Sequence, residues 1–344
     1  MRMMNENSVA ILPSAPALIR NRDVEHGFRQ DSDFMYLSGF DEPESVIVLI
    51  PHRKQGEYVL FCRQRDPQKE TWEGRRFGPE GTVEYFAADE AYPIEDMDEI
   101  LPNLMEGRES VYYSIGLNPT FDKHVIQCVN ELRAQSRCGA RVPYEFVSLE
   151  FLLHDMRLFK GREEISLMRK AAKISVQAHI NAMKKCQPGL NECELEAEFL
   201  YAFKRNNAGW AYSSIVGGGE NSCILHYTEN NAQLNDKELV LIDAGAEYQG
   251  YAADITRTFP VNGKFSVPQQ EIYEVVLEAQ EAAFAKVKPG NHWNDPHNAA
   301  VKALTKGMVN IGLLKGKPAQ LIKNGNYMKY YMHRTGHWLG MDVH

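Results

Sequence analysis

The sequence predicts an α/β protein built from two domains. Its 344 residues are about twice the length of a typical single domain. Segments with strand character alternate with segments of helical periodicity through residues 1–157. A charged stretch at residues 160–164 then separates them from a region that opens with helical spacing. We therefore expect an α/β domain over residues 1–157 and a second domain of helices and strands over residues 158–344.

The first region contains four strand candidates, each a short run of apolar or β-branched residues. The strongest of them, residues 45–50, is stopped by Pro51. Glycine and proline predict a loop over residues 72–79, in which Trp72 either contacts a ligand or another subunit or merely anchors the loop. The other strands are predicted at residues 9–12, 58–61 and 110–113, and helices at residues 94–105 and 121–133.

The second region begins with two predicted helices. The first starts near Ile165 and ends at Pro188-Gly189, and the second begins at Asn191, where Glu194 completes a capping-box pattern, and ends near residue 209. A glycine triplet at residues 217–219 lacks the lysine and helix of a phosphate-binding loop, so we expect a plain turn. Strands are predicted at residues 212–216 and 223–227, and helices at residues 268–286 and 295–312.

Residues 239–260 predict a hairpin that carries two aspartates. Aspartate is disfavoured in strands, yet Asp243 follows four apolar residues and Asp254 stands inside the second strand. A turn centred on Tyr248 and Gln249 would place the two carboxylates opposite each other, with Cβ atoms roughly 4.5–5.5 Å apart. Such a pair repels unless one takes up a proton or a cation lies between them, and two divalent metals about 3.5–4 Å apart fit it. Alternatively, one aspartate caps a turn and the other is a solvated edge residue.

The C-terminal stretch is rich in histidine. His333, His337 and His344 are three of the eleven histidines of the chain, and glycines stand between them. Because glycine lets a ligand or another backbone approach closely, this pattern indicates a site lined by imidazoles. The glycines favour strand and loop over helix, and the H-E-x-x-H motif of zincins is absent.

Composition excludes several partners and locations. The net charge of −8, with both signs mixed along the chain, gives no electrostatic footprint for nucleic acid. No apolar run reaches the roughly 18 residues of a membrane span, and the N-terminal apolar run is too short for a signal peptide. Six cysteines without a C-x-x-C pair indicate reduced thiols. We therefore expect a cytoplasmic protein that binds neither nucleic acid nor membranes.

These motifs together resemble the aminopeptidase P family, the Xaa-Pro aminopeptidases among the pita-bread metallopeptidases. They are the CILHYT motif, the DAG and ADITRT halves of the hairpin, and the H-x3-H-x6-H run, accompanied by RQDSDFMYLSGF and WEGRRFGP in the N-terminal region. The resemblance runs along the whole chain. It implies a creatinase-like N-terminal α/β domain over residues 1–157 and a pita-bread catalytic domain over residues 158–344.

The resemblance also implies a dinuclear metal site, usually manganese, bound by two aspartates, one histidine and two glutamates. Asp243 and Asp254 would be metal ligands, with Asp254 bridging the two metals, and His337 would be the imidazole ligand. The family pattern further implies three catalytic histidines that line the substrate site: His226, His333 and His344. Trp72 is our candidate for a substrate-binding wall of the proline pocket, contributed by a neighbouring subunit; the alternative is that it only anchors its loop.

The implied reaction releases the N-terminal residue from peptides with proline in second position, through attack by a hydroxide that two metals activate. Such peptides would be the substrates, and the enzyme would be a homo-oligomer, a dimer or a tetramer. The nearest alternative is an Xaa-Pro dipeptidase with the same fold and metals. A different class is a metal-free module on the pita-bread fold that binds peptides or proteins.

One departure from the family concerns the two glutamate ligands, which in the family lie beyond the position of His344. We therefore expect that this sequence is a fragment whose pita-bread domain lacks its C-terminal part. A chain without those glutamates should bind metal weakly and have little activity.

Overall fold

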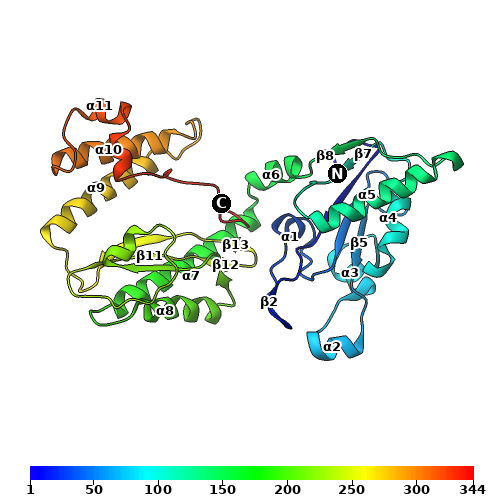
Figure 1. The fold of residues 1–344 in the computed structure, drawn as a ribbon, viewed down its shortest axis with the longest axis horizontal. Coiled ribbons are helices and arrows are strands. Elements are labelled where there is room, and N and C mark those ends of the chain that lie inside the picture. Colours follow the sequence, from blue (N-terminus) through cyan, green and yellow to red (C-terminus); the bar gives the residue numbers. More distant parts are fainter. The chain divides into compact units, whose positions relative to one another are not determined.

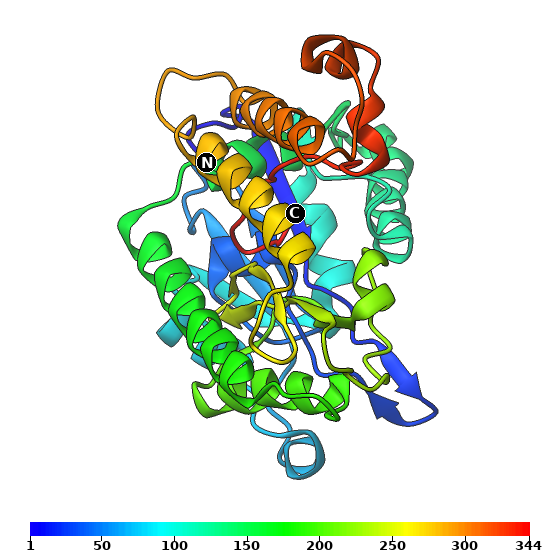
Figure 2. The same cartoon turned by 90° about the vertical axis from the view of Figure 1, so that its left-hand side faces the viewer.

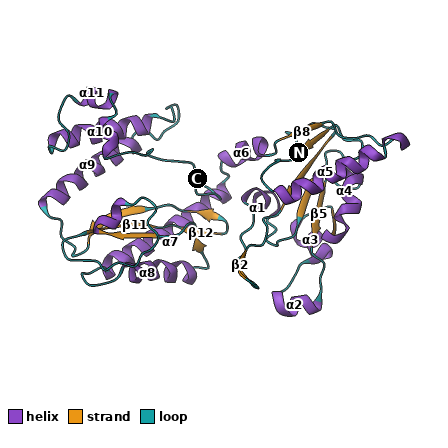
Figure 3. Cartoon of the chain, in the orientation of Figure 1, coloured by secondary structure: helices purple, strands orange, loops and turns teal.

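The computed structural model describes all residues from 1 to 344, which form two compact units, Met1–Lys160 and Gly161–His344 (Figure 1). The predicted boundary after residue 157 lies three residues before this division. Both units combine helices with strands, as the sequence predicted for the α/β class (Figure 3). None of the helices is both long and apolar enough to span a bilayer.

The first unit is built on a mixed six-stranded sheet with the strand order β6-β5-β4-β1-β7-β8. The four strands that the sequence predicted here are confirmed, and they form the middle of the sheet. The edge strands β6 and β8 were not predicted, because each is short and only partly apolar. The strands are β1 (Ser8–Pro13), β4 (Val46–Leu49), β5 (Tyr58–Cys62), β6 (Glu90–Pro93), β7 (Ser110–Tyr112) and β8 (Glu145–Val147), with a separate hairpin of β2 (Ile19–Asn21) and β3 (Val24–Glu25).

Helices cover both faces of this sheet. Successive residues of a strand point to opposite faces, so Val46 and Val48 pack against α4 and α5 while Ile47 packs with Phe34 of α1. Burial on both faces explains why the central strands read as continuous apolar runs. The helices are α1 (Ser32–Ser38), α2 (Pro67–Glu73), α3 (Gly78–Phe86), α4 (Met97–Met105), α5 (Pro119–Ala134) and α6 (Glu150–Leu158).

The loop predicted over residues 72–79 is shorter than expected. Trp72 belongs to α2, which Asp66 caps by accepting hydrogen bonds from two backbone N–H groups, and Pro79 lies in the first turn of α3. Proline is well tolerated there because the first helical N–H groups have no partner in the helix. Only residues 74–77 connect the two helices.

The second unit packs two helices against an antiparallel sheet, β10-β11-β14, around one apolar core. The predicted cap at Asn191 is confirmed: its side chain accepts a hydrogen bond from the backbone of Cys193, and its N–H donates to Glu194. Figure 2 shows the two helices running along the sheet. These elements are α7 (Arg162–Lys185), α8 (Glu192–Arg205), β10 (Ile215–Gly218), β11 (Leu239–Asp243) and β14 (Thr256–Pro260).

A second small sheet and a helical pair complete this unit. The sheet has the order β13-β12-β9, and α9 and α10 lie side by side through a core that includes Ala279 and Leu304 (Figures 1 and 2). The predicted helices after the hairpin are therefore confirmed. The elements are β9 (Gly209–Trp210), β12 (Ala246–Tyr248), β13 (Tyr251–Ala252), α9 (Val267–Phe284), α10 (Asp295–Asn310) and α11 (Pro318–Lys323).

Two predictions around the glycine triplet are wrong. Gly217 and Gly218 lie inside β10 rather than in a turn, and a Cβ atom on Gly217 would come within 2.9 Å of the backbone of Asn221. Residues 223–227 do not form a strand, because a 3-10 turn over Gly219–Cys223 leads into an irregular segment. Close approach of other groups, and not turn formation, therefore accounts for the first two glycines: backbone at Gly217, and the side chain of Leu234 at Gly218.

Candidate metal and catalytic site

The site is organised by the hairpin of β11–β14 with its extension in β12 and β13. Gln249 and Gly250 form the turn with φ values of 49° and 79°, as a type I′ turn requires. The turn therefore lies one residue later than the sequence predicted. As a result, Asp243 pairs with Thr256 and not with Asp254, so the predicted register is wrong.

The two aspartates nevertheless meet, because moving the turn by one residue changes the pairing by two and keeps each side chain on its face. Asp254 becomes a diagonal neighbour of Asp243, within reach for side chains on one face. Gly245 allows the two strands to approach closely here, since a Cβ atom on this residue would lie 1.6 Å from the carbonyl oxygen of Ala253. The backbone continues to pair through this point, where Ala244 N–H donates to Ile255 O at 3.1 Å.

Tyr212 joins the two carboxylates. Its hydroxyl lies 2.5 Å from Oδ1 of Asp243 and 3.1 Å from Oδ1 of Asp254. The neighbouring strand β9 brings it there, because Trp210 pairs with Ala246 of β12. The sequence analysis missed this residue. A tyrosine thirty-one positions before Asp243 carries no local signal, and only the pairing of distant strands identifies it.

The surroundings of the pair favour a bound cation. Burial raises the pKa of the Asp243 carboxyl, and the negative charge of Asp254 raises it further. Hydrogen bonds from Tyr212 and Thr256 and the nearby imidazole of His226 act in the opposite direction on this pKa. Burial and the two carboxylates raise the pKa of Tyr212 itself, so this hydroxyl stays protonated and donates. A divalent cation would relieve the repulsion between the carboxylates.

Two histidines of the C-terminal segment complete the cluster. Nε2 of His337 lies 3.0 Å from Oδ2 of Asp254, and the rings of His337 and His344 are 4.4 Å apart. One ligand atom each from Asp254, His337 and His344 all lie within 4.8 Å of one another. The segment is held in place where Ala252 N–H donates to Gly340 O at 2.8 Å.

The geometry at His337 fits a metal ligand. Its Nδ1 lies 2.7 Å from the carbonyl oxygen of Trp338, which can accept the Nδ1 proton. Its Nε2 faces a carboxylate oxygen of Asp254, so a cation bound between them could take both atoms as ligands. Oxygen and imidazole ligands together suit manganese or zinc.

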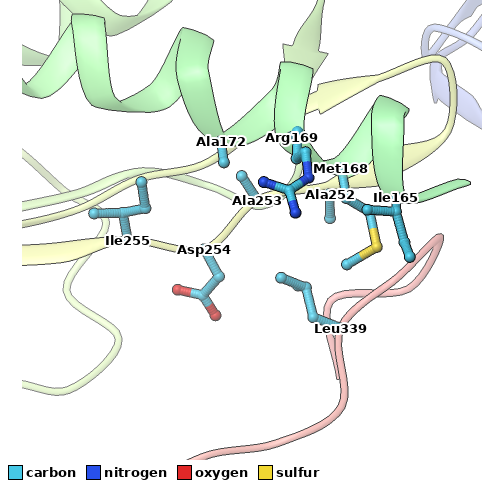
Figure 4. Close-up of a pocket in the computed structure, with 9 residues that line it drawn as sticks. All are labelled: Ile165, Met168, Arg169, Ala172, Ala252, Ala253, Asp254, Ile255 and Leu339. Atoms are coloured by element: carbon cyan, nitrogen blue, oxygen red, sulfur yellow. The ribbon is translucent and has the colours of Figure 1, made fainter. Parts of the chain in front are cut away.

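Asp254 also faces a hollow of about 350 Å³ beside α7. Figure 4 shows its carboxylate with Leu339 of the C-terminal segment beside it and Met168 and Arg169 of α7 above. Apart from Asp254 and Arg169, the walls are apolar. The full lining is Ile165, Met168, Arg169, Ala172, Ala252, Ala253, Asp254, Ile255 and Leu339.

The other predicted site residues lie outside this cluster. His333 packs near Tyr331, with ring centroids 5.1 Å apart, and its Nδ1 contacts the carbonyl oxygen of Arg334. His226 is exposed on the irregular segment after β10, close enough to Asp243 to affect its pKa. Trp72 lies in the first unit with its side chain 88% exposed. The assignment of these residues stays a prediction.

The whole chain is similar to known metallopeptidases. The model of Metallopeptidase family M24 matches residues 166–344, and that of the Aminopeptidase P, N-terminal domain matches residues 1–112. The Xaa-Pro aminopeptidase of Escherichia coli K12 is 43% identical over 343 residues, which cover 99% of this chain and 78% of that protein.

Solved structures of such enzymes share the fold. The aminopeptidase PepP of Pseudomonas aeruginosa matches with a TM-score of 0.99 and 56% identity, over 100% of this chain and 78% of that one. A Zn-substituted E. coli aminopeptidase P in complex with product matches with a TM-score of 0.97 and 42% identity, over 99% and 78% of the two chains. The similarity therefore covers both units of the chain.

Proposed function

This chain belongs to metallopeptidase family M24, and we propose that it is a divalent-metal aminopeptidase that releases the residue before proline at the N-terminus of peptides. The observation that carries the proposal is the position of Asp254 between two sets of groups. Its Oδ1 faces Tyr212, which also contacts Asp243, and its Oδ2 faces His337. A carboxylate with its two oxygens turned to different ligand groups is suited to bridge two metal ions.

We assign Asp243, Asp254 and His337 as metal ligands. We favour Mn²⁺, because carboxylate ligands suit this ion, although the Zn-substituted relative has zinc in its place. When bound, the metal pair would lower the pKa of a water molecule so that hydroxide is available near neutral pH. Tyr212 would hold the Asp243 and Asp254 carboxylates in a fixed orientation, because both accept a hydrogen bond from its single hydroxyl group.

The three catalytic histidines would act on the substrate. His226 would donate a hydrogen bond to the carbonyl oxygen of the scissile bond as negative charge develops on it. His344 and His333 would position the peptide and its proline. The carboxylate of Asp243 would attract the free α-amine of the substrate, and this need for a charged amine would make the enzyme an aminopeptidase rather than an endopeptidase.

The proposed oligomeric state, location and partners follow from the same assignment. Trp72 would form a wall of the proline pocket from a neighbouring subunit of a dimer or tetramer, and its 88% exposed side chain is consistent with a partner. The six cysteines are all free, which supports a reducing, cytoplasmic location. The excess of acidic residues argues against nucleic acid as a partner.

The test compares three substrates with the full-length, Mn²⁺-loaded enzyme. We expect rapid release of the first residue from a tripeptide with proline second, slow cleavage of the matching dipeptide, and no cleavage when alanine replaces proline. Faster cleavage of the dipeptide would favour an Xaa-Pro dipeptidase. A protein that binds the peptide, contains no metal by elemental analysis and cleaves nothing would instead be a binding module.

A further inference from the structure

A buried carboxylate lies at the base of the segment that carries His226. Glu192 is the first residue of α8 and is completely buried. No role in the proposed reaction involves it, and it has no contact with the metal-ligand cluster. It lies beneath residues 219–232, the segment between β10 and β11.

Glu192 accepts four hydrogen bonds from that segment and its borders. Its Oε1 accepts from the N–H of Gly218 at 2.8 Å and the side-chain amide of Asn221 at 3.1 Å. Its Oε2 accepts from the hydroxyl of Tyr227 at 2.8 Å and the N–H of Ala232 at 2.9 Å. Two donors on each oxygen saturate an ionised carboxylate. The α8 N-terminus further stabilises the negative charge.

These four donors are distributed so that they fix the whole segment. Gly218 lies at its start, Ala232 at its end, and Tyr227 is the residue next to His226. The segment has no strand partner of its own, and Ile224 and Leu225 are about half exposed. Its position therefore depends on side-chain hydrogen bonds, with buried Asn230 adding two more to the backbone of Val216 and Ser214.

We propose that Glu192 is a positioning residue that holds His226 at the aspartate pair. This inference rests on the proposed function, because it takes His226 as the group that acts on the substrate. Glutamine at residue 192 has the same shape but only one acceptor oxygen. Whichever way its amide turned, its NH₂ group would face a backbone N–H that cannot accept, that of Gly218 on one side or Ala232 on the other, and the segment would have to move. The effect on catalysis would then pass through His226 alone.

The first experiment measures the segment directly, without activity. Hydrogen–deuterium exchange of the full-length protein should be at least about tenfold faster across residues 217–232 in Glu192→Gln than in the wild type. The matched control is Glu194→Gln, two residues further along α8, because it removes the same charge while its amide can still accept from the N–H of Asn191. Equal exchange in Glu192→Gln and the wild type would overturn the proposal.

The second experiment is a double-mutant cycle on kcat with the Mn²⁺-loaded enzyme. Glu192→Gln should lower kcat about 10- to 100-fold with KM and metal content nearly unchanged, since a displaced donor is lost mainly in the transition state. In the His226→Ala background the same change should have less than about a twofold effect. If the double variant instead lost kcat by the product of the two single losses, the positioning role would be overturned, while the proposed aminopeptidase function would stand.

Two further outcomes separate the inference from the function on which it rests. A His226→Ala enzyme with wild-type kcat would refute the catalytic role of His226, and the positioning role with it. If Glu192→Gln does not fold, Tyr227→Phe removes one of the four donors and should give a smaller loss of kcat in the same direction. If the kcat losses of Tyr227→Phe and His226→Ala multiply in the double variant, the proposal would also be overturned.

Discussion

At the scale of single residues, polar side chains in unfavourable positions identified the chemistry. Asp243 and Asp254 were recognised because aspartate is rare in strands, and His337 because histidines gather near it. Tyr212 was missed, since tyrosine is a common strand residue and its two carboxylate partners are distant in the chain. His179, buried on α7, is a core histidine rather than a residue of the site.

Asp254 should be the least replaceable ligand. Asp254→Asn keeps the shape but removes the negative charge from the oxygens that face Tyr212 and His337. We expect fewer than two metal ions per chain by elemental analysis and turnover below about one-thousandth of the wild-type value. Glu278→Gln, on the exposed face of α9, should leave both unchanged. Near-normal turnover with two metals bound in Asp254→Asn would contradict the bridging role.

His179 should make stability depend on pH. It is buried, with Nε2 3.3 Å from the carbonyl oxygen of Ala244 and no partner for Nδ1. Burial lowers the pKa of His179 below its usual value of about 6.5. The unfolded chain therefore binds more protons than the folded one just below pH 6.5, and stability falls as pH falls through this window.

The measurement for His179 is urea unfolding between pH 7.5 and 5. The full contribution of this residue is present above pH 6.5, and its loss is at most about 1.4 kcal/mol per pH unit. His297, whose pKa burial also lowers, contributes with the same sign. His179→Leu should therefore have a shallower slope than the wild type. Identical slopes for the two proteins would show that His179 does not titrate differently on folding.

At the scale of elements, strong patterns predicted the structure and weak ones did not. The helix beginning at Asn191 and the strands at residues 46–49 and 58–62 were predicted because capping and apolar runs act locally. The register of the hairpin was predicted wrongly, because a turn at Tyr248-Gln249 and a turn at Gln249-Gly250 both keep the two aspartates on one face. The αL conformation of Gln249, in place of a more usual Asn, weakened the turn signal.

Gly245 should be essential for the close approach of the two hairpin strands at Ala253. A Cβ atom there would overlap the carbonyl oxygen of Ala253 at 1.6 Å, and backbone cannot move aside as a flexible side chain can. We expect Gly245→Ala to lower the free energy of unfolding by more than about 2 kcal/mol. Gly209→Ala in β9, the strand that pairs with β12, where no atom lies within 4 Å of the added Cβ, should change it by less than about 0.5 kcal/mol. Equal effects in urea unfolding would refute the steric explanation.

At the scale of the whole molecule, the two units have separate cores, one around the six-stranded sheet and one between α7, α8 and β11. Phe61 is completely buried in the first. Phe61→Ala should destabilise that unit by about 3–5 kcal/mol while the metal content of the protein stays the same. Phe151→Ala, with a 77% exposed side chain, should cost less than about 0.5 kcal/mol. Metal loss in Phe61→Ala under native conditions would show that the cores are coupled.

The sequence by itself determined the fold class, the central strands and most helices, and it singled out Asp243 and Asp254 as a candidate metal-binding pair. These follow from local propensity, from periodicity and from side-chain chemistry, all of which can be read over a few residues. Only the tertiary structure decided the register of the hairpin, the contact of Tyr212 with both carboxylates, and the hold of Glu192 on the segment of His226. Each of these depends on distances between segments that are far apart in the chain, and such distances are set by packing and strand pairing.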